Sequence, residues 1–145
     1  MRYFKDPELD GITRDIVYRL NLNHIDTRRI VCIKSFGTKS RRILARCHTL
    51  PKIIQKALGI EAHYVIEVVS ENFSKLDHQE QLKVLIHELL HIPKTFGGGF
   101  RHHRPYVNRR TVERAYKMYK GSFALNRDSE KLERIGRLSW MRRYI

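Results

Sequence analysis

The sequence predicts an α+β domain, with a small mixed sheet of about three strands packed against one long apolar helix and several flanking helices. Segments with apolar residues at helical spacing alternate with short segments rich in β-branched residues. The chain has 145 residues, of which 41% are hydrophobic, and this is enough for one buried core but little more. We therefore expect a single domain over residues 1–145.

No apolar run approaches the roughly 18–20 residues that span a bilayer. The first residues, MRYFKDPELDG, contain charges and lack the apolar stretch of a signal peptide. We therefore expect a cytoplasmic protein with no membrane partner.

The N-terminal part predicts a helix followed by two strands. Asp6 precedes Pro7, a pair typical of a helix start, and apolar residues at helical spacing extend the helix over 7–22. Residues 29–36 and 42–48 are typical of strands, and the glycine-containing turn between them predicts a hairpin.

The hairpin would place Cys32 and Cys47 on facing strands. Two cysteines are too few for a disulfide scaffold, and reduced core thiols are the usual state inside a cell. We therefore expect no disulfide.

The central part predicts a short helix, a strand and a longer helix. Residues 51–58 begin with proline and are followed by Gly59, which favours a short helix. Residues 63–69 are almost continuously apolar, so they predict a central strand that is covered on both faces. Residues 78–91 have the strongest helical pattern, and Pro93 prevents the helix from continuing.

Positive charge is concentrated in the last third of the chain. The net charge is +14, and residues 101–145 contribute 13 basic and 4 acidic side chains, a net of +9. This part predicts a helix over 108–120, ended by Gly121, and a basic helical segment over about 122–145. The candidate polyanion contacts lie on one stripe of the first of these helices: Arg110, Arg114 and Lys117. The last third is thus a candidate nucleic-acid-binding surface, or a solvated charged face.

The motif His-Glu-x-x-His lies in the helix over 78–91 and comprises His87, Glu88 and His91. Residues four apart share one helix face, so both imidazoles can reach one Zn²⁺ at about 2.0–2.1 Å. Glu88 lies about 100° further around the helix, where it can act as the general base on a zinc-bound water. The sequence therefore predicts one zinc per chain and Glu88 as the catalytic residue.

A third metal ligand should follow the glycines at 97–99, which permit a sharp return of the chain. His102 and His103 are both candidates, and only one should bind because a catalytic zinc keeps one position open for water. Glu113 in the following helix is a further alternative. Three side chains are candidate donors to the oxyanion of the reaction: Arg101, Tyr106 and Tyr116.

The stretch from Arg29 to about Asn108 resembles a family of small zinc metallopeptidases of archaea and phages. The resemblance rests on the segments IVCIKSFGTKSR, ALGIEAHYVIEVVSENFSKL and VLIHELLHIPKTFGGGFR, together with the histidine beyond them. It implies a minimal zincin-like domain, with a short sheet, an active-site helix and a zinc ion. It also implies His103 as the third ligand, although this chain has His102 where the family usually shows proline.

Two other functions fit part of the sequence. A metal-dependent, YbeY-like ribonuclease also places two histidines one turn apart, but it has glycine where this chain has Glu88 and a shorter spacing to the third histidine. A non-enzymatic basic nucleic-acid-binding domain would account for the charge and leave the motif unexplained. We therefore expect a zinc-dependent metallopeptidase that acts on peptides or proteins, some of which could be bound to nucleic acid.

Overall fold

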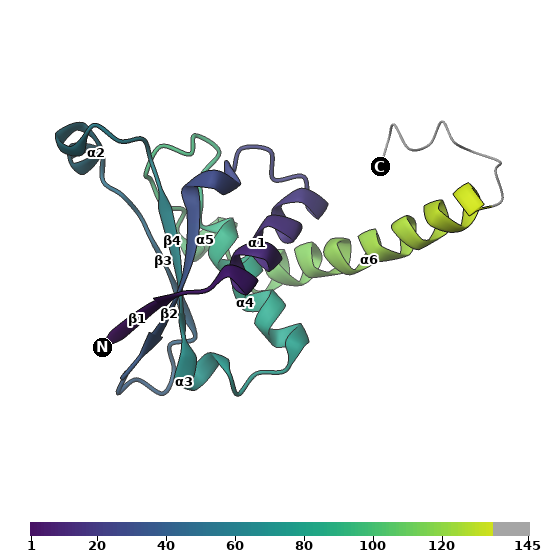
Figure 1. The fold of residues 1–145 in the computed structure, drawn as a ribbon, viewed down its shortest axis with the longest axis horizontal. Coiled ribbons are helices and arrows are strands. Elements are labelled where there is room, and N and C mark those ends of the chain that lie inside the picture. Colours follow the sequence, from purple (N-terminus) through teal and green to yellow (C-terminus); the bar gives the residue numbers. More distant parts are fainter. Residues whose placement is uncertain (135–145) are drawn as a thin grey trace.

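The computed structural model describes the backbone of residues 1–134 and the side chains of residues 1–124. One mixed sheet contains four strands in the order β1-β2-β4-β3 (Figure 1). The strands are β1 (Arg2–Lys5), β2 (Ile30–Phe36), β3 (Ala45–His48) and β4 (Tyr64–Val69). The predicted α+β class with a small mixed sheet is confirmed, and the sheet has one strand more than expected. The short N-terminal strand β1 is the addition.

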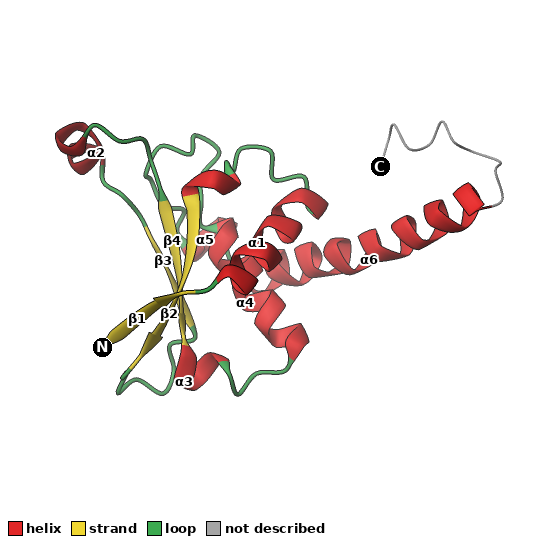
Figure 2. Ribbon diagram, viewed as in Figure 1, coloured by secondary structure: helices red, strands yellow, loops and turns green. Residues whose placement is uncertain are grey.

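The helices are α1 (Pro7–Arg19), α2 (Lys52–Leu58), α3 (Ser70–Phe73), α4 (His78–Leu90), α5 (His103–Tyr106) and α6 (Arg109–Arg134), with a 3₁₀ turn η1 (Thr27–Arg29) before β2. Most of them lie on one face of the sheet, whereas α2 lies apart, beyond the end of the strands, and has no buried residue (Figure 2). Helix α4 lies against β3 and α6, whereas α1 lies against β2. Among the described residues, no helix has the length and apolar character needed to cross a membrane. The expectations of a single domain and a cytoplasmic location stay predictions.

The predicted hairpin between residues 29–36 and 42–48 is wrong, because β4 lies between β2 and β3. Strand β4 runs parallel to β2 and antiparallel to β3. Its nearly continuous apolar sequence suits the central position, where both edges are paired, and the loop between β2 and β3 is too long for a tight turn. Strand β3 is consequently an edge strand beside α4.

The same order explains why the cysteines are free. Cys32 and Cys47 are both register partners of Ile66, so they lie at the same height on either side of β4. Two strand spacings separate them by about 9–10 Å, which exceeds the roughly 7 Å limit for a disulfide. The expected reduced thiols are therefore present.

The first helix begins where the sequence predicts. The Asp6 side chain accepts a hydrogen bond from Leu9 N at 3.1 Å, and Pro7 occupies the first turn. The helix ends at Arg19, three residues before the predicted end, and Asn21 follows with a φ of 52°. Asn tolerates this left-handed conformation better than most residues, which favours a chain reversal at this point.

The last helix is longer than predicted. Gly121 was expected to end it, yet α6 continues to Arg134. A glycine inside a helix costs only about 1 kcal/mol relative to alanine, and no proline follows to stop the helix. The basic segment predicted over 122–145 therefore belongs to α6 as far as Arg134. Its remainder, 135–145, lies outside the described residues.

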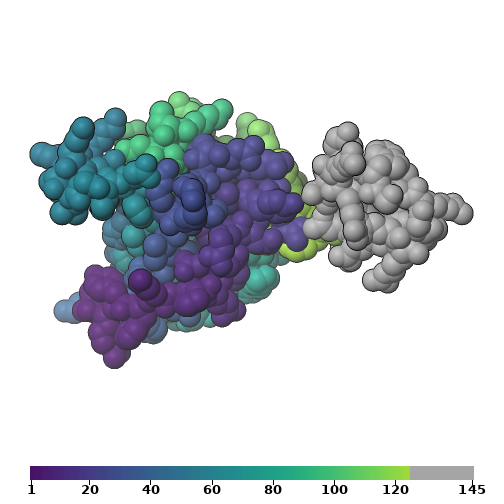
Figure 3. All heavy atoms as spheres, turned by 45° about the horizontal axis from the view of Figure 1, so that its top comes forward, coloured from purple at the N-terminus to yellow at the C-terminus, as the bar shows by residue number. Residues whose placement is uncertain are grey.

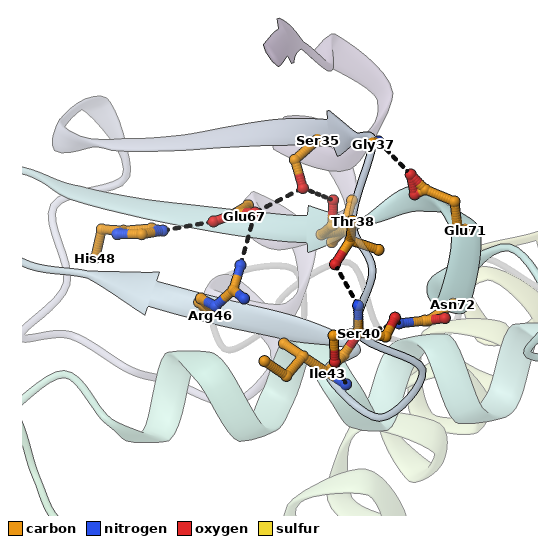
Figure 4. A network of polar contacts seen from close by, with 11 residues as sticks. Ser35, Gly37, Thr38, Ser40, Ile43, Arg46, His48, Glu67, Glu71 and Asn72 are labelled. Atoms are coloured by element: carbon orange, nitrogen blue, oxygen red, sulfur yellow. Dashed lines mark hydrogen bonds and ion pairs between the residues drawn. The ribbon is translucent and has the colours of Figure 1, made fainter. Parts of the chain in front are cut away.

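The sequence predicts that residues 63–69 are covered on both faces of the sheet. The face opposite the helices carries a polar network instead (Figure 4). Glu67 on β4 is only 4% exposed. Its carboxylate accepts hydrogen bonds from Ser35 Oγ at 2.6 Å and Arg46 Nη1 at 3.0 Å, and its other oxygen lies 2.7 Å from His48 Nε2. Arg46 and His48 lie on either side of Cys47 in β3. Glu67 thus links the edge strand β3 to the central strand β4 on the sheet face opposite the helices.

Glu67→Gln is expected to destabilise the fold by about 1–2 kcal/mol at neutral pH. Burial alone would raise the pKa of Glu67, but the bonds from Ser35 and His48 and the charge of Arg46 outweigh burial and lower it below 4.5. A lowered folded-state pKa gives stability that is present above about pH 4.5 and is lost as the pH falls through the lowered value. Urea unfolding at several pH values should therefore show that the free energies of unfolding of the wild type and Glu67→Gln become equal in acid.

Glu61→Gln is the control, because Glu61 is an exposed carboxylate with 81% of its side chain accessible. Its free energy of unfolding should equal that of the wild type to within about 0.5 kcal/mol. If Glu67→Gln lowers the free energy of unfolding by the same amount at neutral and at acid pH, the electrostatic explanation is contradicted.

Candidate metal centre

The bounds of helix α4, which carries the motif, are fixed by capping residues at both ends. The side chain of Asp77 accepts a hydrogen bond from Glu80 N at 2.8 Å and caps the N-terminus, and His91 is the C-terminal cap residue. Leu85, Ile86 and Leu89 are buried against the sheet. The last turn of α4, which carries the motif, lies beside the edge strand β3.

Within this turn, the two motif histidines converge. His87 Nε2 lies 3.2 Å from His91 Nε2. Two tetrahedral ligands at about 2.0–2.1 Å from one zinc ion are about 3.3–3.4 Å apart. The separation of the two nitrogens therefore fits a shared metal ion.

His91 is held in a fixed orientation. It is 2% exposed, and its Nδ1 lies 2.6 Å from the carbonyl oxygen of Arg101. The ring of Phe100 stacks on it with a centroid distance of 4.2 Å and an interplanar angle of 13°. An N–H at Nδ1 that donates to this carbonyl leaves the Nε2 lone pair free toward His87 and a metal.

The loop that supplies the Arg101 carbonyl is anchored at several points. Arg101 N donates to His91 O at 2.7 Å. The hydroxyl of Tyr64, at the start of β4, donates to Gly99 O at 2.9 Å and accepts from Gly98 N at 3.0 Å. Gln55 of α2 donates to Gly97 O at 3.0 Å, and Figure 3 shows the α2 segment (teal) beside this loop (green). The loop that leads back to the metal centre is therefore anchored to the core strand β4 through Tyr64.

Gly98→Ala is expected to destabilise the protein by about 2–3 kcal/mol and to weaken metal binding. Gly98 has a φ of +101°, and a Cβ there would lie 2.5 Å from both Leu50 O and Gln55 Nε2. Gly97→Ala is the matched control, since its Cβ would meet nothing closer than 3.9 Å. Thermal unfolding and zinc titration of both variants test this, and equal effects of the two substitutions would contradict it.

His103 completes a cluster of three imidazoles. One ligand nitrogen from each of His87, His91 and His103 lies within 4.8 Å of the others. The His103 ring is exposed at the start of α5. Ligands of one tetrahedral zinc are about 3.3–3.4 Å apart, so binding would require the three nitrogens to be no further apart than this. His102 is the residue before α5 and lies outside the cluster. Glu113 also lies outside it, with its carboxylate 2.8 Å from Lys83 Nζ.

The protonation states of the histidines suit a metal. Burial, with the neighbouring His91 and His103, lowers the pKa of His87 to about 4. Burial also lowers the pKa of His91, although the Arg101 carbonyl opposes this shift. Both rings are therefore neutral at pH 7 and offer lone pairs, which is the form that binds zinc. A donor set of three neutral imidazoles fits Zn²⁺ well.

Glu88 lies beside this cluster and is 7% exposed. Burial raises its pKa to about 7, even though the backbone N–H of Cys47 donates to its carboxylate. This contact brings Glu88 next to the edge strand β3. A carboxylate with such a pKa can both accept and release a proton near neutral pH.

The candidate oxyanion donors are separated by the fold. Arg101 on the loop before α5 and Tyr106 at the end of α5 lie together, with the guanidinium carbon 5.1 Å from the Tyr106 ring centroid. Tyr116 is 8% exposed within the hydrophobic core, and Lys83 Nζ lies 5.2 Å from its ring centroid. The roles of all three stay predictions.

The basic stripe of α6 is exposed as its spacing predicts. It comprises Arg110, Arg114 and Lys117. Solvent exposure agrees equally with a charged surface and with phosphate contacts, so nucleic-acid binding also stays a prediction.

Sequence analysis missed the partners that orient the site. The carbonyl of Arg101 and the ring of Phe100 position His91 through contacts between segments distant from the motif. Glu67 could have been noticed, because a lone carboxylate inside the apolar segment 63–69 needs partners when it is buried.

Comparison with known proteins gives one finding. A family model described as "Putative phage metallopeptidase" matches residues 1–133. Neither the curated proteins nor the solved structures contain a match to the chain.

Proposed function

Because the chain belongs to the phage metallopeptidase family, we propose that it is a zinc-dependent peptidase in which His87, His91 and His103 hold one Zn²⁺ and Glu88 is the general base. One observation carries the proposal: three imidazoles converge beside a buried carboxylate whose pKa is about 7. A surface cluster of histidines would have no such neighbour.

The residues of the chain supply positioning and proton transfer. A zinc ion held by His87, His91 and His103 would supply Lewis-acid chemistry, lowering the pKa of a water to about 7 and polarising the scissile carbonyl. Glu88 takes a proton from the attacking water onto its carboxylate, and later gives it to the leaving nitrogen of the peptide. The Cys47 N–H fixes the position of this carboxylate. The low exposure of Glu88 limits its access to bulk water.

Strand β3 is the proposed guide for the substrate. It is an edge strand, so its outer backbone groups other than the Cys47 N–H, which Glu88 occupies, can pair with an extended peptide. Its residue Cys47 contacts Glu88, which places a paired peptide beside the general base. The Glu67 network holds β3 from the opposite side through Arg46 and His48.

The test is to assay peptide and RNA cleavage side by side with the zinc-loaded protein. We expect peptide cleavage that is abolished by a chelator and restored by zinc, with RNA left intact. Zinc-dependent RNA cleavage without peptide cleavage would instead favour the YbeY-like ribonuclease.

A further inference from the structure

A cavity of about 670 Å³ extends from the metal centre along α4. His87 and Glu88 form its inner end, and Glu80 lies at its outer end two turns earlier on the same helix. Eight residues of helix span about 12 Å, a distance that holds about three to four residues of extended peptide. Residues 42–45, which lead into β3, form a second wall, and the start of α6 forms the third.

The middle of the cavity is apolar. Leu44, Val84 and Val112 line it from the three walls. Val112 is 7% exposed and belongs to the core, so this wall is firm. A large apolar side chain that enters next to the inner end would gain about 25 cal/mol for each Å² of apolar surface that it buries.

The outer part of the cavity has a net charge of +1, because three basic side chains (Arg42, Lys83 and Arg109) and two carboxylates (Glu80 and Glu113) line it. Lys83 lies 2.8 Å from Glu113 and 3.5 Å from Glu80, so these three groups largely satisfy one another. Arg42 and Arg109 also line the cavity and are exposed. Among the described residues neither forms a close ion pair, although the charge of Arg109 helps to lower the pKa of Glu113. Two guanidiniums without a close ion pair attract carboxylates that bind between them.

Arg109 lies in the first turn of α6, which has no acidic residue. A cation at this end of a helix is unfavourable, because the helix dipole is positive there. The dipole adds to the positive potential of the two arginines at the outer end of the cavity.

We propose that this cavity selects peptides with a large apolar residue next to the scissile bond and with Asp or Glu one or two residues further along. This inference rests on the proposed function, since it takes the scissile carbonyl to lie at the metal centre. The apolar residue occupies the space between Leu44, Val84 and Val112, and the acidic residue reaches Arg42 and Arg109.

A peptide library digested by the zinc-loaded protein tests this selectivity, with the cleaved bonds identified by mass spectrometry. We expect apolar and then acidic residues to be enriched on one side of the cleaved bond. The double variant Arg42→Glu/Arg109→Glu should lower the preference for acidic residues by at least about tenfold, because like charges then face each other. The control Arg41→Glu/Lys120→Glu makes the same charge change at exposed residues that do not line the cavity, and it should keep the preference.

A second readout separates this inference from the proposed function. Binding of labelled peptides to Glu88→Gln protein is measured by fluorescence anisotropy, using Leu followed by two Asp, Leu followed by two Lys, and Gly followed by two Asp. The first peptide should bind at least about tenfold more tightly than the other two. This binding order without any cleavage by the wild type would support the cavity and overturn the peptidase. Cleavage without the preference, or a preference equally reduced in the control, would overturn the cavity proposal alone.

Discussion

Glu88→Gln is expected to reduce peptide hydrolysis by about 10²–10⁴-fold and to leave the bound zinc at the wild-type level. The amide has nearly the same shape as the carboxylate but does not accept the proton of the attacking water. Because burial disfavours the charged form of Glu88, the neutral amide should not destabilise the fold. Initial rates on a cleaved peptide and zinc content by atomic emission measure the two effects.

Glu61→Gln is the control for this substitution, since it removes an exposed carboxylate and should keep both rate and zinc. A Glu88→Gln protein that binds zinc, remains folded and cleaves peptide at the wild-type rate would contradict the role of Glu88 as general base.

His91→Ala has the second large expected effect, a loss of zinc affinity of more than about 100-fold. Loss of a residue that only orients a metal ligand through a hydrogen bond costs about 10–100-fold in metal affinity, and this substitution removes a ligand itself. It also leaves a cavity under Phe100 and deprives the Arg101 carbonyl of a buried partner, which should cost about 2–4 kcal/mol of folding stability. Competition with a chromophoric zinc chelator measures the affinity.

His78→Ala is the matched control, because His78 lies exposed in the first turn of the same helix. It should bind zinc as the wild type does. Equal zinc affinity of folded His91→Ala and His78→Ala proteins would contradict the assignment of His91 as a ligand.

The part of the site that lies on one helix could be predicted from the sequence. His87, Glu88 and His91 are neighbours in the chain, and their geometry follows from 3.6 residues per turn. The cap at Asp6 and the central position of β4 were predictable for the same reason, since both depend on local sequence and on apolar patterning.

The partners of these elements could not be predicted in this way. The order of β2, β3 and β4 depends on contacts between segments far apart in the chain, so the turn-like sequence between β2 and β3 wrongly predicts a hairpin. The place of His103 in the cluster depends on the anchoring of its loop by Tyr64. The length of α6 depends on how much a single glycine weakens a helix, and Gly121 alone does not decide it.

The meaning of the net charge of +14 also changes once the structure is considered. On sequence alone it suggests nucleic acid. Two arginines at the outer end of the cavity, Arg42 and Arg109, belong to the site proposed for peptide side chains. Part of the basic character can thus serve substrate selection by a peptidase.

The central claim is that His87, His91 and His103 hold one zinc ion. The most direct test is the number of zinc ions that remain bound per chain after the zinc-loaded protein is dialysed against metal-free buffer. We expect about one zinc per chain in the wild type and in His102→Ala, and a large loss in His103→Ala, because only His103 belongs to the cluster. A folded wild type that retains no zinc would contradict the metal centre itself. Retention in His103→Ala with loss in His102→Ala would contradict the choice of third ligand.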